Sequence, residues 1–373
     1  MALPRQRQGI PRGSGRTRRG GWLIPISKPS LGEAEKAAAA SALTSGMLTG
    51  GEEVEGFEQE FGGIVGGRPC IAVNSGTSAL IACLVALGIG PGDEVIIPGF
   101  TFGATANAVL LVGASPVLAD IDPVTFCLCP KSVSERITSR TAAILPVHLY
   151  GHPAPMAELL KLAKRNGLSV IEDAAQAHGA SSGDTPCGAL GDAAAFSFHA
   201  TKNMTTGEGG MAVFKDPRAA EKAAIIRNQG MNSAYQYEMT GFNFRMLAMA
   251  AAIGRVQLKR LPELTEVRLK NAHLYDGAIT NHRTPRVMAG DRHVYHQYTL
   301  TSSNRDDLLN RLRESGIDAR VYYPNPLSDF PIYRHDGYPL PNASQAASAV
   351  VSIPVGPHMS ETDLVRVVEV VES

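Results

Sequence analysis

Short apolar segments alternate with segments of helical pattern between Pro69 and about Phe214. The apolar segments lack polar alternation, so each is expected to be a strand buried on both faces. Strands that alternate with helices in this way form a mostly parallel sheet covered by helices. The expected strands are "CIAVN", "EVIIP", "PVLADI", "AAILPVHLY", "SVIED" and "AAAFSF", and the expected helices between them include "TSALIACLVALG", "TFGATANAVLLVG" and "PMAELLKLAKRNG". The pattern predicts an open α/β domain.

After Asp216 the regular alternation of short strand-like and helical segments ends. Long helical patterns occupy 217–230 and 245–279, and the strand-like stretches "HVYHQYTLTS" and "ARVYYP" flank the helical "RDDLLNRLRESGI". The chain ends in the amphipathic pattern "ETDLVRVVEVVE". We therefore expect a large domain over residues 22–250 and a smaller C-terminal α+β domain over residues 251–373.

Residues 1–21 hold six arginines and no acidic residue, although the whole chain has a formal net charge of zero. Such a basic, glycine-rich start is expected to be a disordered tail, because it has no apolar segment to bury. The same lack of an apolar core excludes a secretory signal. A role of this segment in nucleic-acid binding is a minor alternative.

The longest apolar run, at about 104–119, is interrupted by Asn107, Gly113 and Pro116, so no membrane span is expected. The five cysteines are scattered and form no CxxC pair. An odd, unpaired set fits a reducing cytoplasm better than a disulfide framework or a metal site.

An open parallel sheet binds ligands at the carboxyl ends of its strands, so the residues that follow each strand are candidate site residues. "NSGTS" follows the first strand and opens a helix, where small residues, free amide N–H groups and two hydroxyls suit a phosphate. The same residues also suit an ordinary helix N-cap. Neither the GxGxxG nor the GxxxxGK[ST] motif occurs here, which argues against a dinucleotide or a P-loop site.

Three other strand ends carry candidate groups. "GFTF" places Phe102 where it could stack on a flat ring, although an aromatic residue at this position could equally be core. Glu172 and Asp173 end a buried strand, and a buried carboxylate needs a cationic partner unless it only caps the next turn. His178 has no second His or Cys at ligand spacing, so no metal is expected.

The last strand end carries Ser197 and then Lys202, before a turn rich in glycine. A phosphate cradle, a stacking ring, a carboxylate and a lysine together describe a site for pyridoxal 5'-phosphate (PLP). The lysine would form an imine with the cofactor, and the carboxylate would keep the ring nitrogen protonated. The order of these features along the chain makes their combination specific.

With these motifs the chain resembles the PLP-dependent nucleotide-sugar aminotransferases of the DegT family, which have the fold-type I architecture. The resemblance covers the chain from about residue 24 to its end. The motifs that carry it are "VNSGTSAL", "PGFTFGATANAV", "VIEDAAQAHGA", "FSFHATKNMTTGEGG", "GFNFRM" and "VYYPNPL".

The resemblance implies a role for each matching residue. Lys202 would be the Schiff-base lysine, and Asp173 would pair with the pyridine nitrogen. Gln176 would bind the ring hydroxyl, and Phe102 would stack on the ring. The phosphate would be held by Gly76, Thr77 and Ser197, and Asn243 would reach the phosphate of the neighbouring subunit's cofactor. A homodimer with shared active sites is therefore expected.

Two positions bear on the reaction. Relatives often carry a histidine where this chain has Ser328, so contacts to substrate there are open. A subgroup of relatives replaces the lysine with histidine and dehydrates its substrate, and Lys202 argues against that outcome.

The function that the resemblance implies is transfer of an amino group from L-glutamate to a keto-sugar nucleotide. The phosphate segment "SGTSAL" and the start "IPISKPSLGEAE" are more similar to the subgroup that acts on 4-keto-6-deoxy sugars linked to TDP or UDP. The alternatives are amination of a 3-keto sugar or a keto-cyclitol, a PLP-dependent sugar dehydratase, and a non-enzymatic sensor of sugar nucleotides.

Overall fold

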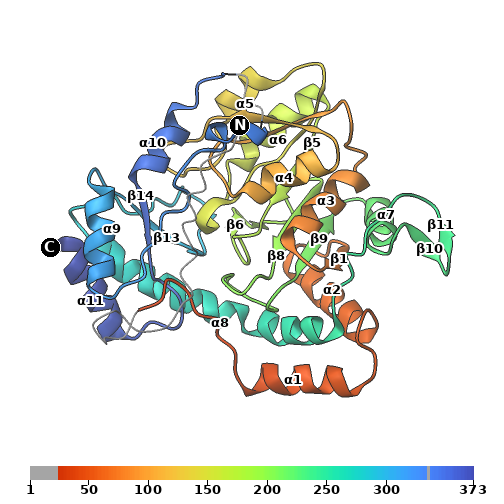
Figure 1. Cartoon of the computed structure of the whole chain (residues 1–373), viewed down its shortest axis with the longest axis horizontal. Helices are drawn as coiled ribbons and strands as arrows, with labels where there is room; N and C mark the ends of the chain where they lie inside the picture. The colour runs from red at the N-terminus through yellow and green to blue at the C-terminus, as the bar shows by residue number, and fades with distance from the viewer. Residues whose placement is uncertain (1–23, 334–336) are drawn as a thin grey trace, which may run out of the picture.

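A central sheet of seven strands, in the spatial order β1-β9-β8-β5-β4-β2-β3, organises the molecule. Strands β1, β9, β8 and β5 of this sheet are labelled in Figure 1. Six strands run in one direction, and β9 alone runs antiparallel to both of its neighbours. The strands are β1 Cys70–Val73, β2 Glu94–Pro98, β3 Ser115–Ala119, β4 Thr141–Ile144, β5 Ser169–Asp173, β8 Ala193–Ser197 and β9 Gly210–Phe214. The expected mostly parallel sheet is confirmed.

The computed structural model describes residues 24–333 and 337–373. The basic tail predicted over residues 1–21 lies outside the described residues.

Helices cover both faces of the sheet. Successive residues of a strand point to opposite faces, so Ile71 and Val73 of β1 enter one apolar cluster while Cys70 and Ala72 enter another. The helices of this unit are α2 Glu52–Ile64, α3 Gly76–Ala86, α4 Gly103–Leu111, α5 Pro130–Arg136, α6 Met156–Asn166 and α7 Pro217–Arg227. Burial on both faces explains why the strands are apolar throughout.

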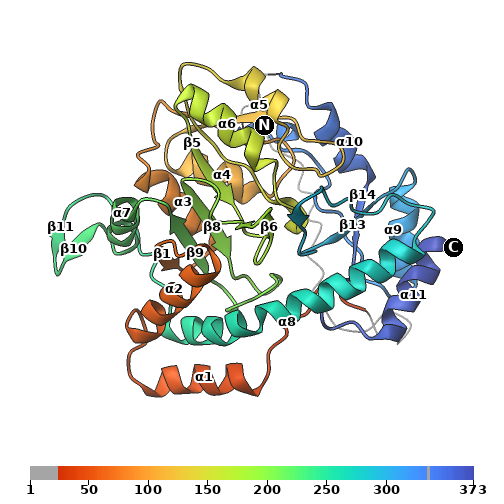
Figure 2. The same cartoon turned by 180° about the vertical axis from the view of Figure 1, so that it is seen from behind.

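The long helix α8 Ala248–Ala278 runs from the sheet to the C-terminal unit, and α1 Glu33–Thr44 packs along it (Figures 1 and 2). The C-terminal unit has its own apolar cluster around the antiparallel strands β13 and β14. Its elements are β13 Tyr298–Thr301, α9 Arg305–Glu314, α10 Pro341–Ala349, β14 Val350–Ile353 and α11 Glu361–Glu372. The domain boundary placed after residue 250 falls inside the first turn of α8 and stays a prediction.

Short strands and 3-10 turns complete the described chain. They are β6 Ser181–Ser182, β7 Thr185–Pro186, β10 Met231–Ser233, β11 Gln236–Tyr237, β12 Asp291–Arg292, η1 Leu149–Gly151, η2 Leu327–Asp329 and η3 Pro331–Tyr333. The hairpin of β10 and β11 projects from the edge of the molecule next to α7 (Figures 1 and 2). No helix among the described residues combines the length and the apolar character that crossing a bilayer requires.

Two strand predictions were wrong in detail. β4 ends at Ile144, and the rest of "AAILPVHLY" forms a loop and η1. "ARVYYP" contributes only an isolated bridge between Arg320 and Ser352, because its two tyrosines bond to another part of the chain. The strand β9 was not predicted as a strand.

Candidate active site

A cavity of about 380 Å³ opens at the carboxyl ends of the parallel strands. It is lined by residues that follow β1, β2, β5 and β8. Seven of the eight residues predicted for the site line this cavity, and they are Gly76, Thr77, Phe102, Asp173, Gln176, Ser197 and Lys202. The sheet topology thus brings together groups that lie far apart in the sequence.

Asn243 is the exception, since it does not line the cavity of its own chain. Its side chain is exposed, and its backbone carbonyl accepts a hydrogen bond from the Asn74 side chain at 3.3 Å. Ser328 does not line the cavity either; it lies in η2.

The N-terminus of α3 forms one wall of the cavity. Ser75 caps this helix, because its hydroxyl oxygen accepts the Ser78 N–H at 3.1 Å. The amide N–H groups of Gly76 and Thr77 have no acceptor among the described residues. Two free amide donors at a helix N-terminus suit an anion such as the cofactor phosphate.

Close packing dictates a glycine at two points of this wall. A Cβ atom on Gly76 would lie 2.7 Å from Cβ of Ser197. A Cβ atom on Gly210 would lie 2.3 Å from the Ser75 carbonyl oxygen, which is backbone and cannot move aside easily. The glycine cluster after Lys202 therefore lets β9 approach the start of α3.

Asp173 is buried at the floor of the cavity. Its carboxylate accepts hydrogen bonds from the Thr105 hydroxyl at 2.9 Å and from the Ala175 N–H at 3.2 Å. No Lys or Arg among the described residues forms an ion pair with it. Burial raises the pKa of Asp173, against hydrogen bonds and the nearby Lys202 charge that lower it. A buried carboxylate without a bonded cation fits a protonated ring nitrogen.

The side chain of Gln176 has a fixed orientation. Its oxygen accepts the Tyr150 N–H at 2.7 Å, and its nitrogen donates to the Tyr323 hydroxyl at 3.2 Å. One amide hydrogen remains free to donate, which suits the ring hydroxyl of the cofactor.

Phe102 is 61% exposed and lies at the N-cap of α4 on the wall of the cavity. Its ring centroid is 5.9 Å from that of Tyr323. An aromatic face that is left exposed beside a cavity can cover a flat ligand, whereas a core residue would be enclosed.

Lys202 is half-buried, and its side chain lines the cavity. Its backbone N–H donates to the His199 carbonyl at 2.9 Å, but its Nζ forms no hydrogen bond with a described residue. Burial lowers the pKa of Lys202 from 10.5 to about 8, and the Asp173 charge opposes this shift. A lysine amine with a lowered pKa is suited to nucleophilic and base chemistry.

The cavity also contains residues that the sequence patterns did not single out. They are mainly aromatic and polar side chains from the loops, including Tyr150, His296, Gln297, Tyr322 and Tyr323. "HVYHQYTLTS" has a strand-like pattern and "VYYPNPL" is one of the motifs that carry the family resemblance, but a tyrosine or histidine in such a stretch gives no signal of its own.

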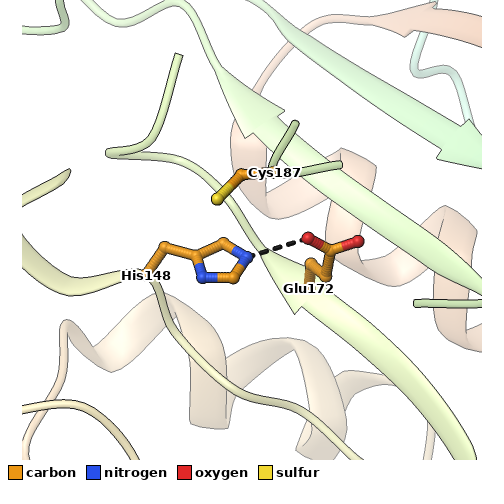
Figure 3. A group of neighbouring side chains, drawn as sticks. All are labelled: His148, Glu172 and Cys187. Atoms are coloured by element: carbon orange, nitrogen blue, oxygen red, sulfur yellow. Dashed lines mark hydrogen bonds and ion pairs between the residues drawn. The ribbon is translucent and has the colours of Figure 1, made fainter. Parts of the chain in front are cut away.

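A second cluster lies beneath the site, where His148, Glu172 and Cys187 place their ligand atoms within 4.8 Å of one another (Figure 3). His148 donates to Glu172 at 2.9 Å through Nε2, because its Nδ1 accepts the Ala154 N–H. Both oxygens of Glu172 already accept two hydrogen bonds each, so this cluster is satisfied without a cation. His178 is buried against the rings of Phe196 and Phe198.

Comparisons with known proteins identify the family of this chain. The DegT/DnrJ/EryC1/StrS aminotransferase family matches residues 29–372. A "Pleiotropic regulatory protein" of Geobacillus stearothermophilus is 42% identical over 86% of this chain and 88% of its own length. The dTDP-3-amino-3,4,6-trideoxy-alpha-D-glucose transaminase of Streptomyces venezuelae is 40% identical over 90% of each chain.

Among solved structures, S. venezuelae DesV in complex with a ketimine intermediate superposes with a TM-score of 0.87. It is 40% identical to this protein and covers 91% of this chain and 93% of its own. The match to the family extends over nearly all the described residues, which include every residue that lines the cavity. This chain therefore belongs to the DegT/DnrJ/EryC1/StrS aminotransferase family and is a PLP-dependent aminotransferase of fold-type I.

Proposed function

We propose that this enzyme transfers an amino group from L-glutamate to a keto-sugar nucleotide, with PLP held in the cavity that Lys202 lines. One observation carries the proposal: a lysine with a free amine, a buried carboxylate without a bonded cation and an open helix N-terminus share one cavity.

The chain's own residues would hold the cofactor at three points. Gly76 and Thr77 would bind the phosphate through their N–H groups, together with the Ser197 hydroxyl. Asp173 would bind the protonated ring nitrogen and Gln176 the ring hydroxyl, while Phe102 would cover one face of the ring. These contacts fix the ring plane against the amine of Lys202, which is a positioning effect.

PLP, when bound, supplies an electron sink for the carbon that carries the reacting amine. Lys202 would take a proton from that carbon and deliver it to the cofactor. Only the neutral form of its amine can accept the proton. The lowered pKa of about 8 leaves a substantial neutral fraction of this amine at mildly alkaline pH. Asp173 would keep the ring nitrogen protonated throughout.

The acceptor is the finer part of the proposal. A 4-keto-6-deoxyhexose linked to TDP or UDP stays the prediction from the N-terminal segment of the chain. A 3-keto sugar is a second candidate, since the Streptomyces relative at 40% identity is named for a 3-amino product. A dehydratase has less support, because Lys202 is present.

We also propose that the active enzyme is a homodimer. Leu48 and Leu247 are 51% and 50% exposed and lie side by side, with the Ala248 N–H donating to the Leu48 carbonyl at 2.9 Å. Met47 and Met249 lie next to this pair in the sequence and are also exposed, and the four residues make up the apolar patch that we propose as the interface. The exposed Asn243 is four residues from Leu247. A cytoplasmic location, inferred from the scattered cysteines, stays a prediction.

The first test is the absorption spectrum of the protein reconstituted with PLP, before and after addition of L-glutamate, beside Lys202→Ala. We expect a visible band in the wild type that glutamate bleaches, and neither effect in the variant. A wild-type spectrum that glutamate leaves unchanged would overturn the choice of donor, and a variant indistinguishable from the wild type would overturn the role of Lys202.

The acceptor is tested next, with glutamate and a panel of TDP- and UDP-linked 3-keto and 4-keto hexoses. Mass spectrometry of the amino-sugar nucleotide identifies the keto position that is used. Amination of none of these sugars would contradict the proposed substrate class.

A further inference from the structure

His296 is a second nitrogen group in the cavity of Lys202, and neither the sequence motifs nor the family comparison gives it a role. Its side chain is only 6% exposed. A buried histidine is either charged and paired or neutral with a defined tautomer, and the two forms differ in the atoms that can accept a proton.

The neighbours of His296 fix its tautomer. Nδ1 of His296 lies 3.3 Å from Oδ1 of Asn203, and Nδ2 of Asn203 donates to the Val294 carbonyl at 3.0 Å. The second contact orients the Asn203 amide, so its oxygen faces the imidazole. An amide oxygen can only accept, and Nδ1 of His296 must therefore carry the hydrogen.

The imidazole is neutral. Burial lowers the pKa of His296 well below 6.5, and the positive charges of Lys202 and Arg268 lower it further, together with the nearby His178 and His199. A neutral ring with its hydrogen on Nδ1 has a bare lone pair on Nε2.

The Nε2 lone pair is available in the cavity. No described residue forms a hydrogen bond with Nε2 of His296. Some side-chain nitrogens and oxygens of the described chain are both unpaired and closed off from solvent, and Nε2 of His296 is not one of them. The amine of Lys202 has no hydrogen-bond partner there either, and it ends a flexible four-carbon stem. The cavity thus contains one free donor amine and one free acceptor nitrogen.

We propose that Nε2 of His296 accepts a hydrogen bond from Nζ of Lys202 when the amine is protonated and its flexible stem turns towards the imidazole, so that His296 positions the amine and stabilises its ammonium form. His296 is then a positioning residue that acts through Lys202. Asn203 follows Lys202 directly in the sequence, so the same turn supplies the amine and the group that orients its acceptor. The inference rests on the assignment of Lys202 as the reactive amine.

Other groups bear on the charge of Lys202 and define the controls. Asp173 raises the pKa of Lys202 from the floor of the cavity. His199 lies at the mouth, where it bonds to Thr201 and lies 3.9 Å from Glu208. His178 is enclosed between aromatic rings.

The test compares His296→Asn with His296→Gln in the protein freed of cofactor. The asparagine amide can replace Nδ1 as a donor to Asn203 but leaves no acceptor at the position of Nε2. The longer glutamine side chain can place its oxygen near that position. The readout is the pH dependence of acetylation of Lys202 by acetic anhydride, followed by mass spectrometry of the peptide that contains Lys202.

We expect the midpoint for Lys202 to fall by about one pH unit in His296→Asn, the size that a charge-assisted hydrogen bond of ordinary strength supplies. His296→Gln should restore most of this shift. His199→Asn, which removes an imidazole from the same cavity, should leave the midpoint in place. Circular dichroism and thermal melting show that each variant is folded.

A midpoint in His296→Asn equal to that of the wild type would overturn the proposal, as would an equal fall in both His296 variants. The readout needs neither PLP nor a substrate. Failure of the proposed function would instead appear in the spectrum of the reconstituted wild type, so the two failures are distinguishable.

Discussion

Asp173 makes the protein without cofactor less stable, and we propose that the same residue is needed to bind PLP. Its carboxylate is buried with two neutral donors and no bonded cation, so burial raises its pKa. An acid whose pKa is raised by folding makes the folded state less stable as the pH rises through that pKa. A ring nitrogen that carries a proton would relieve this cost.

We therefore predict opposite effects of Asp173→Asn on the two forms. The variant without cofactor should melt at the same or a higher temperature than the wild type at pH 7, because asparagine keeps hydrogen-bonding capacity and removes the buried charge. Its affinity for PLP should fall by roughly ten- to a hundredfold, as expected when a charge-assisted hydrogen bond is lost. Unchanged affinity would contradict the pairing of Asp173 with the ring nitrogen.

Lys202 permits a prediction for pH dependence. Folding lowers its pKa from 10.5 to about 8, so the cavity disfavours the charged amine. This penalty is present below pH 8 and disappears as the pH rises towards 10.5. The cofactor-free wild type should gain stability over this window relative to Lys202→Met, measured as the difference between their melting temperatures at each pH. A constant difference would show that the amine is not perturbed.

The loop that follows β7 is held against the sheet by hydrogen bonds to the buried carboxylate of Glu172. The carboxylate of Glu172 accepts the N–H groups of Gly188, Leu190 and Gly191, at 2.7 to 2.9 Å. The guanidinium of Arg68 donates to carbonyls of the same loop. Glu172 precedes Asp173 on β5 and points to the other face of the sheet, so the hydrogen bonds of Glu172 to this loop support the floor of the site from beneath.

We predict that Glu172→Gln destabilises the protein by about 2–4 kcal/mol, because the new NH2 group would face two hydrogen-bond donors that then lack an acceptor. Burial raises the pKa of Glu172, but hydrogen bonds from His148 and the loop lower it below 4.5 overall. The stabilisation that these hydrogen bonds give is therefore present above pH 4.5, and it is lost as the pH falls through the lowered pKa of Glu172. Urea denaturation at several pH values measures both effects.

The exposed Glu263 on α8 provides the control, since Glu263→Gln should change stability by less than about 0.5 kcal/mol. Equal losses of stability in the two variants would show that the hydrogen bonds of Glu172 to the loop after β7 do not stabilise the protein.

The elements differ in how far the sequence predicts them. The parallel strands were predictable because burial on both faces leaves short apolar runs between helices, as in β2 and β5. Strand β9 was missed because it follows the lysine turn without a crossover helix, and its antiparallel direction depends on pairing between β1 and β8. "ARVYYP" has the composition of a strand. Tyr322 and Tyr323 nevertheless accept hydrogen bonds from the Tyr150 and Gln176 side chains and do not pair with a neighbouring strand.

The site was predictable to the same extent as the sheet. Residues at the ends of parallel strands or in the turns that follow them, such as Asp173 and Lys202, meet because the strand ends meet. His296 and Tyr323 come from loops of the C-terminal part of the chain, and their positions depend on packing that no local spacing encodes. The tautomer of His296 follows only from a contact with Asn203, which is 93 residues away in the sequence.

On the scale of the whole molecule, the apolar patch of Met47, Leu48, Leu247 and Met249 predicts how copies associate. Leu48→Asp combined with Leu247→Asp should convert a dimer to a monomer in sedimentation velocity, because two charges would have to be buried at the interface. Val365→Asp is the matched control, since Val365 is 51% exposed on α11 at the other end of the molecule (Figure 1). A double variant that still sediments as a dimer would place the interface elsewhere.

Whether the two active sites are shared is a separate question, and Asn243 provides the means to answer it. Its side chain is exposed and does not line the cavity of its own chain, so its proposed contact with a phosphate must be made in a partner. We predict that Lys202→Ala and Asn243→Asp are each inactive, the second because a carboxylate repels the phosphate. Mixed dimers of the two variants should nevertheless regain activity.

The recovery follows from the arrangement of the two sites. In a mixed dimer with shared sites, one site receives both substitutions and the other receives neither, so the second site works normally. If Asn243 acted within its own chain, each site would have one defect and mixing would restore nothing. Activity measured after co-expression with two affinity tags distinguishes these arrangements, and each homodimer purified alone gives the baseline.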